Sequence, residues 1–184
     1  MGSFMQIELK DIKGGVLKQE YTCSRDEFPE LGILAEQGDV EFVDPLGFRL
    51  RLQRTGQLVE VEGQLTAVVQ LKCGRCLKPF TQSLDESFAL TFAPRSETDV
   101  SDEEEIELEA DELGLILYDD ETLELFAPLQ EQLLMAVPIA PVCDDSCQGL
   151  CHECGQNLND GTCSCERKPF NNKFSALAGI KFKE

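Results

Sequence analysis

The sequence has no long apolar run. No stretch approaches the roughly 18 apolar residues that a membrane-spanning helix needs, so we expect no contact with a membrane. The N-terminal residues MGSFMQIELK lack a basic region followed by an apolar stretch, and we therefore expect no secretory signal. The chain has one histidine, no glycine-rich phosphate loop, and no Ser–His or Cys–His pair at a spacing that supports catalysis. These absences predict a protein that is not an enzyme and has no small-molecule substrate.

Positive charge is missing from a long internal stretch. The 184 residues include 16 Lys and Arg against 35 Asp and Glu, a formal net charge of -19. No Lys or Arg lies between Arg95 and Arg167, and residues 96–166 hold 20 of the 35 acids. The rest of the chain has 15 acids against 16 bases, a balance of +1. This distribution excludes the middle of the chain, but not its ends, from binding nucleic acid.

The acidic segment 96–112 is the densest part of this stretch, with ten Asp and Glu residues. Like charges in such a block repel one another, so it normally stays solvated. The alternative is a docking surface for a basic partner, such as a ribosomal protein.

The remaining composition, 42% apolar, favours one ordinary domain with a small appended module. Apolar and polar residues alternate with period two, as in strands with one wet face, in the stretches 5–9, 48–52, 59–71 and 80–92. The last two stretches flank residues 72–79 and predict a long antiparallel hairpin. Gly63 interrupts the clearest of these runs, and a glycine within a strand predicts a bulge or bend.

One main helix is expected after the acidic segment. Pro128 is tolerated only in a first helical turn, so the helix should begin near it, and Pro138 should end it. The residues that form its apolar stripe are Leu125, Phe126, Leu129, Leu133 and Ala136.

Nine cysteines are the most specific feature of the sequence. Cys23 stands alone among polar and charged neighbours, and we interpret it as a plain strand or loop residue. The other eight are the pair Cys73 and Cys76 and the C-terminal set Cys143, Cys147, Cys151, Cys154, Cys163 and Cys165.

Zinc is the favoured interpretation of these eight cysteines. Structural zinc takes four thiolates in a tetrahedron, and a C-x-x-C step presents two of them on one turn. Eight cysteines therefore make two sites with none left over. Gly155, directly after Cys154, lets the backbone turn so that amides approach the sulfurs.

Three other interpretations of the cysteines remain open. Disulfides fit poorly with an odd cysteine count and no export signal. An iron–sulfur cluster is raised by Cys147-x3-Cys151-x2-Cys154, the spacing of radical S-adenosylmethionine enzymes, although too few residues follow for their barrel. A redox-active pair at Cys73 and Cys76 has Arg75 and Lys72 nearby to lower a thiol pKa, but it lacks the strand–helix context of thioredoxin.

Two partitions of the eight ligands are possible. The favoured one joins Cys73 and Cys76 to Cys143 and Cys147, because short loops cost less entropy to close. It leaves a local site formed by Cys151, Cys154, Cys163 and Cys165. The alternative joins the first pair to Cys151 and Cys154. His152 lies inside the second knuckle, where middle residues point outward, so we expect it not to be a ligand.

The C-terminal residues 167–184 form a basic, aromatic tail. Phosphate contacts and base stacking by such residues would suit RNA, while their helical spacing equally suits docking onto the domain or onto a partner. The candidate contact residues are Arg167, Lys168, Phe170, Lys173 and Phe174.

Several segments together resemble the YceD family, whose members are called large ribosomal RNA subunit accumulation proteins. They are Cys73-Gly-Arg-Cys76, Val137-Pro138-Ile139-Ala140-Pro141-Val142-Cys143, the run from Gln148 to Asn159, Cys163-Ser164-Cys165 and Phe174-Ser175-Ala176-Leu177. The resemblance implies a non-enzymatic factor needed for normal levels of large-subunit ribosomal RNA. It implies ribosomal proteins or precursor RNA as partners and a location in the bacterial cytoplasm or, for a plastid protein, the chloroplast stroma.

The expected fold class is α+β: an antiparallel sheet with a long hairpin, one main helix and a cysteine-rich zinc-binding C-terminal segment. Residues 1–142 would form the core with the knuckle 73–76 and the acidic segment, residues 143–166 the zinc module, and 167–184 the tail. Two zinc ions are the expected cofactors. The functional alternative is an iron–sulfur or thiol redox protein.

Overall fold

The computed structural model describes residues 5–38, 40–95 and 114–165. The acidic segment 96–112 and the tail 167–184 lie outside these residues. The strands are β1 (Gln6–Glu8), β2 (Val16–Cys23), β3 (Val40–Thr55), β4 (Leu58–Lys72), β5 (Pro79–Pro94), β6 (Leu115–Tyr118) and β7 (Thr122–Glu124). The α-helices are α1 (Pro29–Glu36) and α2 (Phe126–Met135), and short 3-10 turns lie at 9–11, 13–15 and 25–27.

A five-stranded sheet in the order β2-β3-β4-β5-β6 forms the body of the protein. The first four strands are antiparallel, and β4 and β5 form the predicted hairpin, with Lys72 paired to Pro79 at its tip. The expectation of a purely antiparallel sheet is wrong at one edge, because β6 runs parallel to β5. A parallel neighbour needs a crossover of a dozen or more residues. The connection that contains the acidic segment is long enough to provide it.

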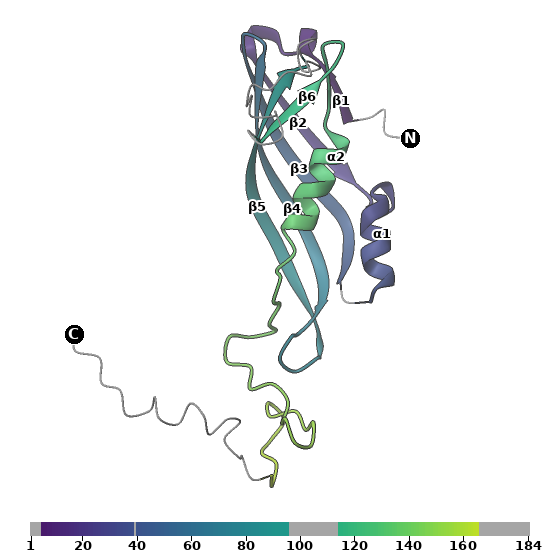
Figure 1. Cartoon of the computed structure of the whole chain (residues 1–184), viewed down its shortest axis with the longest axis vertical. Coiled ribbons are helices and arrows are strands. Elements are labelled where there is room, and N and C mark those ends of the chain that lie inside the picture. The colour runs from purple at the N-terminus through teal and green to yellow at the C-terminus, as the bar shows by residue number, and fades with distance from the viewer. Residues whose placement is uncertain (1–4, 39, 96–113, 166–184) are drawn as a thin grey trace, which may run out of the picture.

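The core lies on one face of this sheet. Figure 1 shows α2 crossing that face, with α1 at its side and β1 near the end that carries β6. The short strands β1 and β7 pair with each other and pack into the same core, although they are far apart in sequence. The α+β class is therefore confirmed.

The alternation in β4 decides which face is buried. Its buried side chains are Val59, Val61, Leu65, Ala67, Val69 and Leu71. The other face carries polar side chains that pair across strands: Arg51 Nη1 lies 3.0 Å from Glu62 Oε2, and Gln64 Nε2 donates to Asp85 Oδ1 at 2.6 Å. The face away from the core thus stays hydrated, as the period-two pattern predicts.

The described residues form two α-helices, so the expectation of one main helix is incomplete. Helix α2 agrees with the prediction: Pro128 lies in its first turn, and Leu129 and Leu133 are buried. Helix α1 buries only Leu31. A short helix with one buried residue produces no apolar stripe, which is why the sequence pattern did not predict it.

Gly63 does not mark a bulge. The ladder runs through it without a shift, pairing it with Leu50 on β3 and Phe88 on β5. A Cβ at residue 63 would lie 2.1 Å from Cζ of Phe88, so the ring of Phe88 covers the glycine. The shift in register lies instead in β3, between Val43 and Gly47. Gly63 is thus explained by close approach of a ring and not by a bend.

We expect Gly63→Ala to lower the free energy of unfolding by about 1–3 kcal/mol, because the added methyl overlaps the packed ring of Phe88. In a Phe88→Ala background the same substitution should be neutral or stabilising by up to about 1 kcal/mol, since alanine loses less backbone entropy than glycine. Urea unfolding of the four proteins measures both effects. Equal costs in the two backgrounds would contradict this explanation.

None of the helices in the described residues is long and apolar enough to cross a membrane. Residues 143–165 contain no helix or strand, apart from an isolated bridge between Leu150 and Asn157. This segment lies beyond the tip of the β4–β5 hairpin (Figure 1). The cysteine-rich part of the chain is therefore at one end of the molecule.

Candidate metal centres

Four thiols meet at the tip of the β4–β5 hairpin. Cys73 and Cys76 belong to the turn between the two strands, and Cys143 and Cys147 belong to the segment after α2. Their sulfur atoms all lie within 4.8 Å of one another. We call this group cluster A. Cys73, Cys76 and Cys147 are buried, and Cys143 is exposed.

A second group of four thiols lies within the C-terminal segment. Cys151, Cys154, Cys163 and Cys165 also have all their sulfurs within 4.8 Å of one another, and we call them cluster B. Only Cys151 is buried, while Cys154 is exposed. Cluster B is therefore more open to solvent than cluster A.

The grouping of the sulfurs is the one that the favoured partition predicts. Cys147 belongs to cluster A, and Cys151 and Cys154 belong to cluster B. The three cysteines with radical-enzyme spacing thus do not meet at one site. All nine cysteines are free thiols in the structure.

The sulfur separations in cluster A match a single tetrahedral ion. Cys73 Sγ lies 3.8 Å from Cys147 Sγ, and Cys76 Sγ lies 3.7 Å from Cys143 Sγ. Zinc–sulfur bonds of about 2.3 Å at tetrahedral angles give sulfur–sulfur edges of about 3.8 Å. The donor set and its spacing therefore fit a zinc ion bound by four thiolates. Tetrahedral iron with four thiolates has a similar geometry.

The two C-x-x-C turns have the same backbone hydrogen bonds. In the first, Leu77 N donates to Cys73 O at 2.9 Å and Cys73 N donates to Lys78 O at 3.0 Å. In the second, Gly155 N donates to Cys151 O and Cys151 N to Gln156 O, both at 2.8 Å. Leu77 and Gly155 occupy equivalent positions and both have positive φ, 60° and 74°. The prediction that Gly155 allows a tight turn agrees with this geometry.

Arg75 holds the segment after α2 against the first knuckle. Its Nη1 donates to the carbonyl oxygens of Asp145 and Cys147 at 2.9 and 3.1 Å, and Leu150 N donates to Arg75 O at 3.1 Å. Its backbone N–H points to Cys73 Sγ at 3.4 Å. The Arg75 guanidinium therefore binds backbone carbonyl oxygens, and it is the backbone N–H of Arg75 that contacts a thiol. This differs from the redox interpretation, in which the charged side chain lowers a thiol pKa.

Backbone amides prepare one thiol in each cluster to lose its proton. Hydrogen bonding by the backbone of Cys143, with smaller contributions from Cys76 and Arg75, lowers the pKa of Cys73 to about 6. The backbones of Cys154 and Glu153 lower the pKa of Cys151 to about 6. Desolvation, followed by the neighbouring thiols, raises the pKa of Cys143 to about 12. Since thiolates are the metal-binding form, the amides favour the charge that a cation needs.

The remaining candidate residues lie as follows. His152 is on the outside of the second knuckle, with its side chain 58% exposed and its Nε2 3.5 Å from Glu153 Oε1. Cys23 is the last residue of β2 and is buried in the main core, away from both clusters. The candidate contact residues of the tail, from Arg167 to Phe174, lie outside the described residues.

Cys23 should be the one cysteine that resists alkylation after the clusters lose their metal. Cys23 is buried in the main core, which stays folded without metal, and burial also raises the pKa of its thiol to about 11, whereas chelation opens the two clusters and exposes their thiols to the reagent. The pKa of Cys23 in the folded chain lies above the ordinary value of 9.0, so folding is favoured while this thiol stays protonated. Its contribution to the free energy of unfolding is fully present below pH 9 and is lost as the pH rises toward 11. Mass spectrometry after iodoacetamide treatment should find no label on the metal-loaded chain at pH 8, eight labels after chelation and nine in denaturant. Nine rapid labels on the folded chain would contradict the placement of Cys23.

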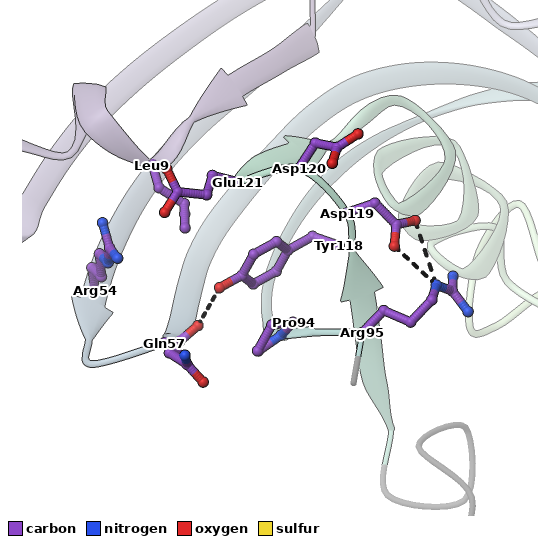
Figure 2. Close-up of a pocket in the computed structure, with 9 residues that line it drawn as sticks. All are labelled: Leu9, Arg54, Gln57, Pro94, Arg95, Tyr118, Asp119, Asp120 and Glu121. Carbon is purple, nitrogen blue, oxygen red and sulfur yellow. Dashed lines mark hydrogen bonds and ion pairs between the residues drawn. The ribbon is translucent and has the colours of Figure 1, made fainter. Parts of the chain in front are cut away.

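A pocket of about 350 Å³ lies at the opposite end of β4, beside the turn between β3 and β4. Figure 2 shows Tyr118 pointing to this turn, where its hydroxyl donates to Gln57 O at 2.7 Å, and Arg95 Nε donating to Asp119 Oδ1 at 3.1 Å. Its lining includes no cysteine, histidine or serine. The pocket therefore contains none of the thiols that form the candidate centres.

The fold and the two clusters define an α+β protein with two candidate four-thiolate metal centres. The sequence model of a family described as "Large ribosomal RNA subunit accumulation protein YceD" matches residues 61–181, more than half of the chain. The chain belongs to the YceD family. The matched region contains both clusters and all of the β4–β5 hairpin except the first three residues of β4.

Curated relatives agree with this assignment. An uncharacterised protein of Mycobacterium tuberculosis is 34% identical over 114 residues, which cover 61% of this chain and 51% of that protein. The "Large ribosomal RNA subunit accumulation protein YCED homolog 1, chloroplastic" of Arabidopsis thaliana is 24% identical over 91% of this chain and 58% of its own length. The maize protein of the same name is 28% identical over 70% of this chain and 50% of its own. The chain thus spans about half the length of these relatives. No solved structure matches it.

Proposed function

We propose that this chain is a zinc-stabilised, non-enzymatic factor that supports the accumulation of large-subunit ribosomal RNA. The family description and the names of the plant relatives support the pathway. The observation that supports the metal is the arrangement of eight of the nine cysteines in two groups of four, each with its sulfurs within 4.8 Å.

The role of zinc at cluster A is to fasten the hairpin tip to the segment after α2. Cys73, Cys76 and Cys147 are the buried residues of a small cluster of their own, separate from the main core, with Phe80, Val142 and Leu150 packed around them. Among the described residues, few apolar side chains support this end of the molecule. Metal–thiolate bonds therefore replace the apolar contacts that a larger core would provide.

The partners we propose are a ribosomal protein, another ribosome-assembly component or precursor ribosomal RNA. The acidic segment 96–112 would hold a basic protein, and the tail residues Arg167, Lys168 and Lys173 would contact RNA or a second protein. This proposal keeps the predicted division of the chain into a core of residues 1–142, a zinc module of residues 143–166 and a tail of residues 167–184. We place the protein in the bacterial cytoplasm or the chloroplast stroma, where reduced thiols persist.

Complementation tests this function. In cells lacking the chain, the wild type should restore the ratio of large- to small-subunit ribosomal RNA, and Cys73→Ser/Cys76→Ser should not. Cys23→Ala, which changes a cysteine outside both clusters, is the matched control and should restore the ratio. Full restoration by the double variant would show that cluster A is not needed for the proposed role.

The metal content separates zinc from the iron–sulfur alternative. Protein purified from cells without added metal should be colourless and contain zinc. A brown protein that contains iron would instead support a cluster or redox function, and the zinc proposal would then be wrong.

A further inference from the structure

The two clusters are connected by side chains from one loop. Residues 155–162 lie between Cys154 and Cys163, so both ends of this loop are held by cluster B. Asn159 Nδ2 donates to Cys147 Sγ of cluster A at 3.4 Å. Asp160 Oδ1 accepts from Nζ of Lys78, two residues after Cys76, at 2.9 Å. The loop closed by cluster B therefore contacts both segments that supply ligands to cluster A, the hairpin turn and the segment after α2.

The amide of Asn159 is held in a defined orientation. Its Oδ1 accepts from Gln148 N, and its Nδ2 also donates to Asn157 Oδ1, both at 2.8 Å. The loop backbone is fixed as well, because Leu158 N donates to Gly149 O at 2.9 Å. Asn159 thus connects the backbone after Cys147 to its sulfur through one planar group.

A hydrogen bond to a thiolate stabilises the charged form and orients the ligand. Asn159 Nδ2 makes such a contact with Cys147 Sγ, at 3.4 Å. Partners that orient metal ligands in this way typically change metal affinity by about 10- to 100-fold. The position of Asn159 in turn depends on a loop that lacks helix and strand and whose two ends belong to cluster B.

We propose that the loop 155–162 couples the two metal centres, with Asn159 as the positioning residue, so that metal bound at cluster B strengthens metal binding at cluster A. This inference rests on the proposed metal binding. Closing cluster B fixes the loop and delivers the Asn159 N–H to Cys147. Since binding free energies are linked, metal at cluster A strengthens binding at cluster B by the same factor.

Cobalt titration of the full-length chain measures the coupling. Cys163→Ser/Cys165→Ser leaves cluster A as the four-thiol site, and Cys73→Ser/Cys76→Ser leaves cluster B. The coupling factor is the overall association constant of the wild type for two ions divided by the product of the two single-site constants. We expect a factor of about 10–100 in the wild type. A factor of one would overturn the proposal.

Variants of Asn159 separate positioning from general support of the loop. Asn159→Ala should reduce the factor toward one, and Asn159→Asp should do the same, because it keeps the acceptor for Gln148 N but loses the N–H donor. Both should shift the sulfur-to-cobalt charge-transfer band of cluster A, because both remove the hydrogen bond from Asn159 Nδ2 to Cys147 Sγ. Thr162→Ala is the control, because this exposed residue of the same loop makes no hydrogen bond to any described residue; it should leave the factor and the band unchanged.

The outcomes distinguish the two proposals. Two ions bound with a coupling factor of one would overturn the coupling and leave the metal centres intact. A wild-type factor that Asn159→Asp does not reduce would overturn the role of the N–H donor. A wild-type chain that binds no cobalt in reducing buffer would overturn both proposals.

Discussion

Cys73→Ser should remove the metal ion of cluster A and release the cysteine-rich segment from the hairpin tip, while the sheet remains folded and cluster B keeps its ion. Cys73 is fully buried, and its sulfur is surrounded by the other three thiols of cluster A. Apparent binding free energies of structural zinc reach about 10–16 kcal/mol in small zinc-binding peptides, which exceeds what the few apolar contacts here can supply. The loss should therefore be large and local.

Hydrogen exchange of individual amides measures this local effect of Cys73→Ser most directly. The amide of Leu150, which donates to Arg75 O at the hairpin tip, should lose its protection. The amides of β4 should keep theirs, because β4 packs into a main core that contains neither cluster. Metal analysis should find one ion in place of two.

Cys23→Ala is the control for Cys73→Ser. It removes a buried cysteine of the main core, so it should cost about 1 kcal/mol from a small cavity and keep two metal ions. Protection of Leu150 that is unchanged in Cys73→Ser would show that the end of the molecule is held by something other than metal.

Phe28→Ala should produce the second large effect, a loss of about 3–5 kcal/mol in the free energy of unfolding. Phe28 is 0% exposed and stacks on Phe126 of α2, with ring centroids 5.2 Å apart and planes 6° apart. It also contacts Phe48 of β3, with centroids 6.1 Å apart. One ring therefore joins the start of α1, the start of α2 and the sheet.

Urea unfolding monitored by circular dichroism measures this loss. Ile33→Ala, on α1 but 52% exposed, is the matched control and should change stability by less than about 0.5 kcal/mol. Below its unfolding transition the Phe28→Ala protein should still bind two metal ions, because the clusters lie outside this core. Equal effects of the two substitutions would contradict the packing described for Phe28.

The sequence predicts the elements that have strong periodicity. The alternation around Val61 and Leu65 predicts β4, and the stripe through Leu129 predicts α2. The sequence pattern does not predict β2. This strand lies at the sheet edge, and its core-facing positions include Gln19 as well as Leu17, so its alternation of apolar and polar residues is weak. The parallel pairing of β6 and the pairing of β1 with β7 join segments far apart in sequence, and no local pattern contains that information.

The cysteine pattern contains most of the information about the candidate site. Loop-closure entropy alone favours the grouping that the structure has. The contribution of Asn159 could not be derived in this way, because a contact with Cys147 depends on how the loop folds back across cluster A. The hydrogen bond from the Arg75 guanidinium to Asp145 O could not be derived from the sequence either, because it also depends on how the segment after α2 folds back onto the hairpin tip.

Native mass spectrometry of the chain, purified under reducing conditions without added metal, tests the central claim most directly. Each cluster should hold one zinc ion, so the folded chain should carry two. Cys73→Ser and Cys163→Ser should each lower this number, and Cys23→Ala should not. A folded wild-type chain without bound metal would contradict the account. The same metal content in all three variants would also contradict it.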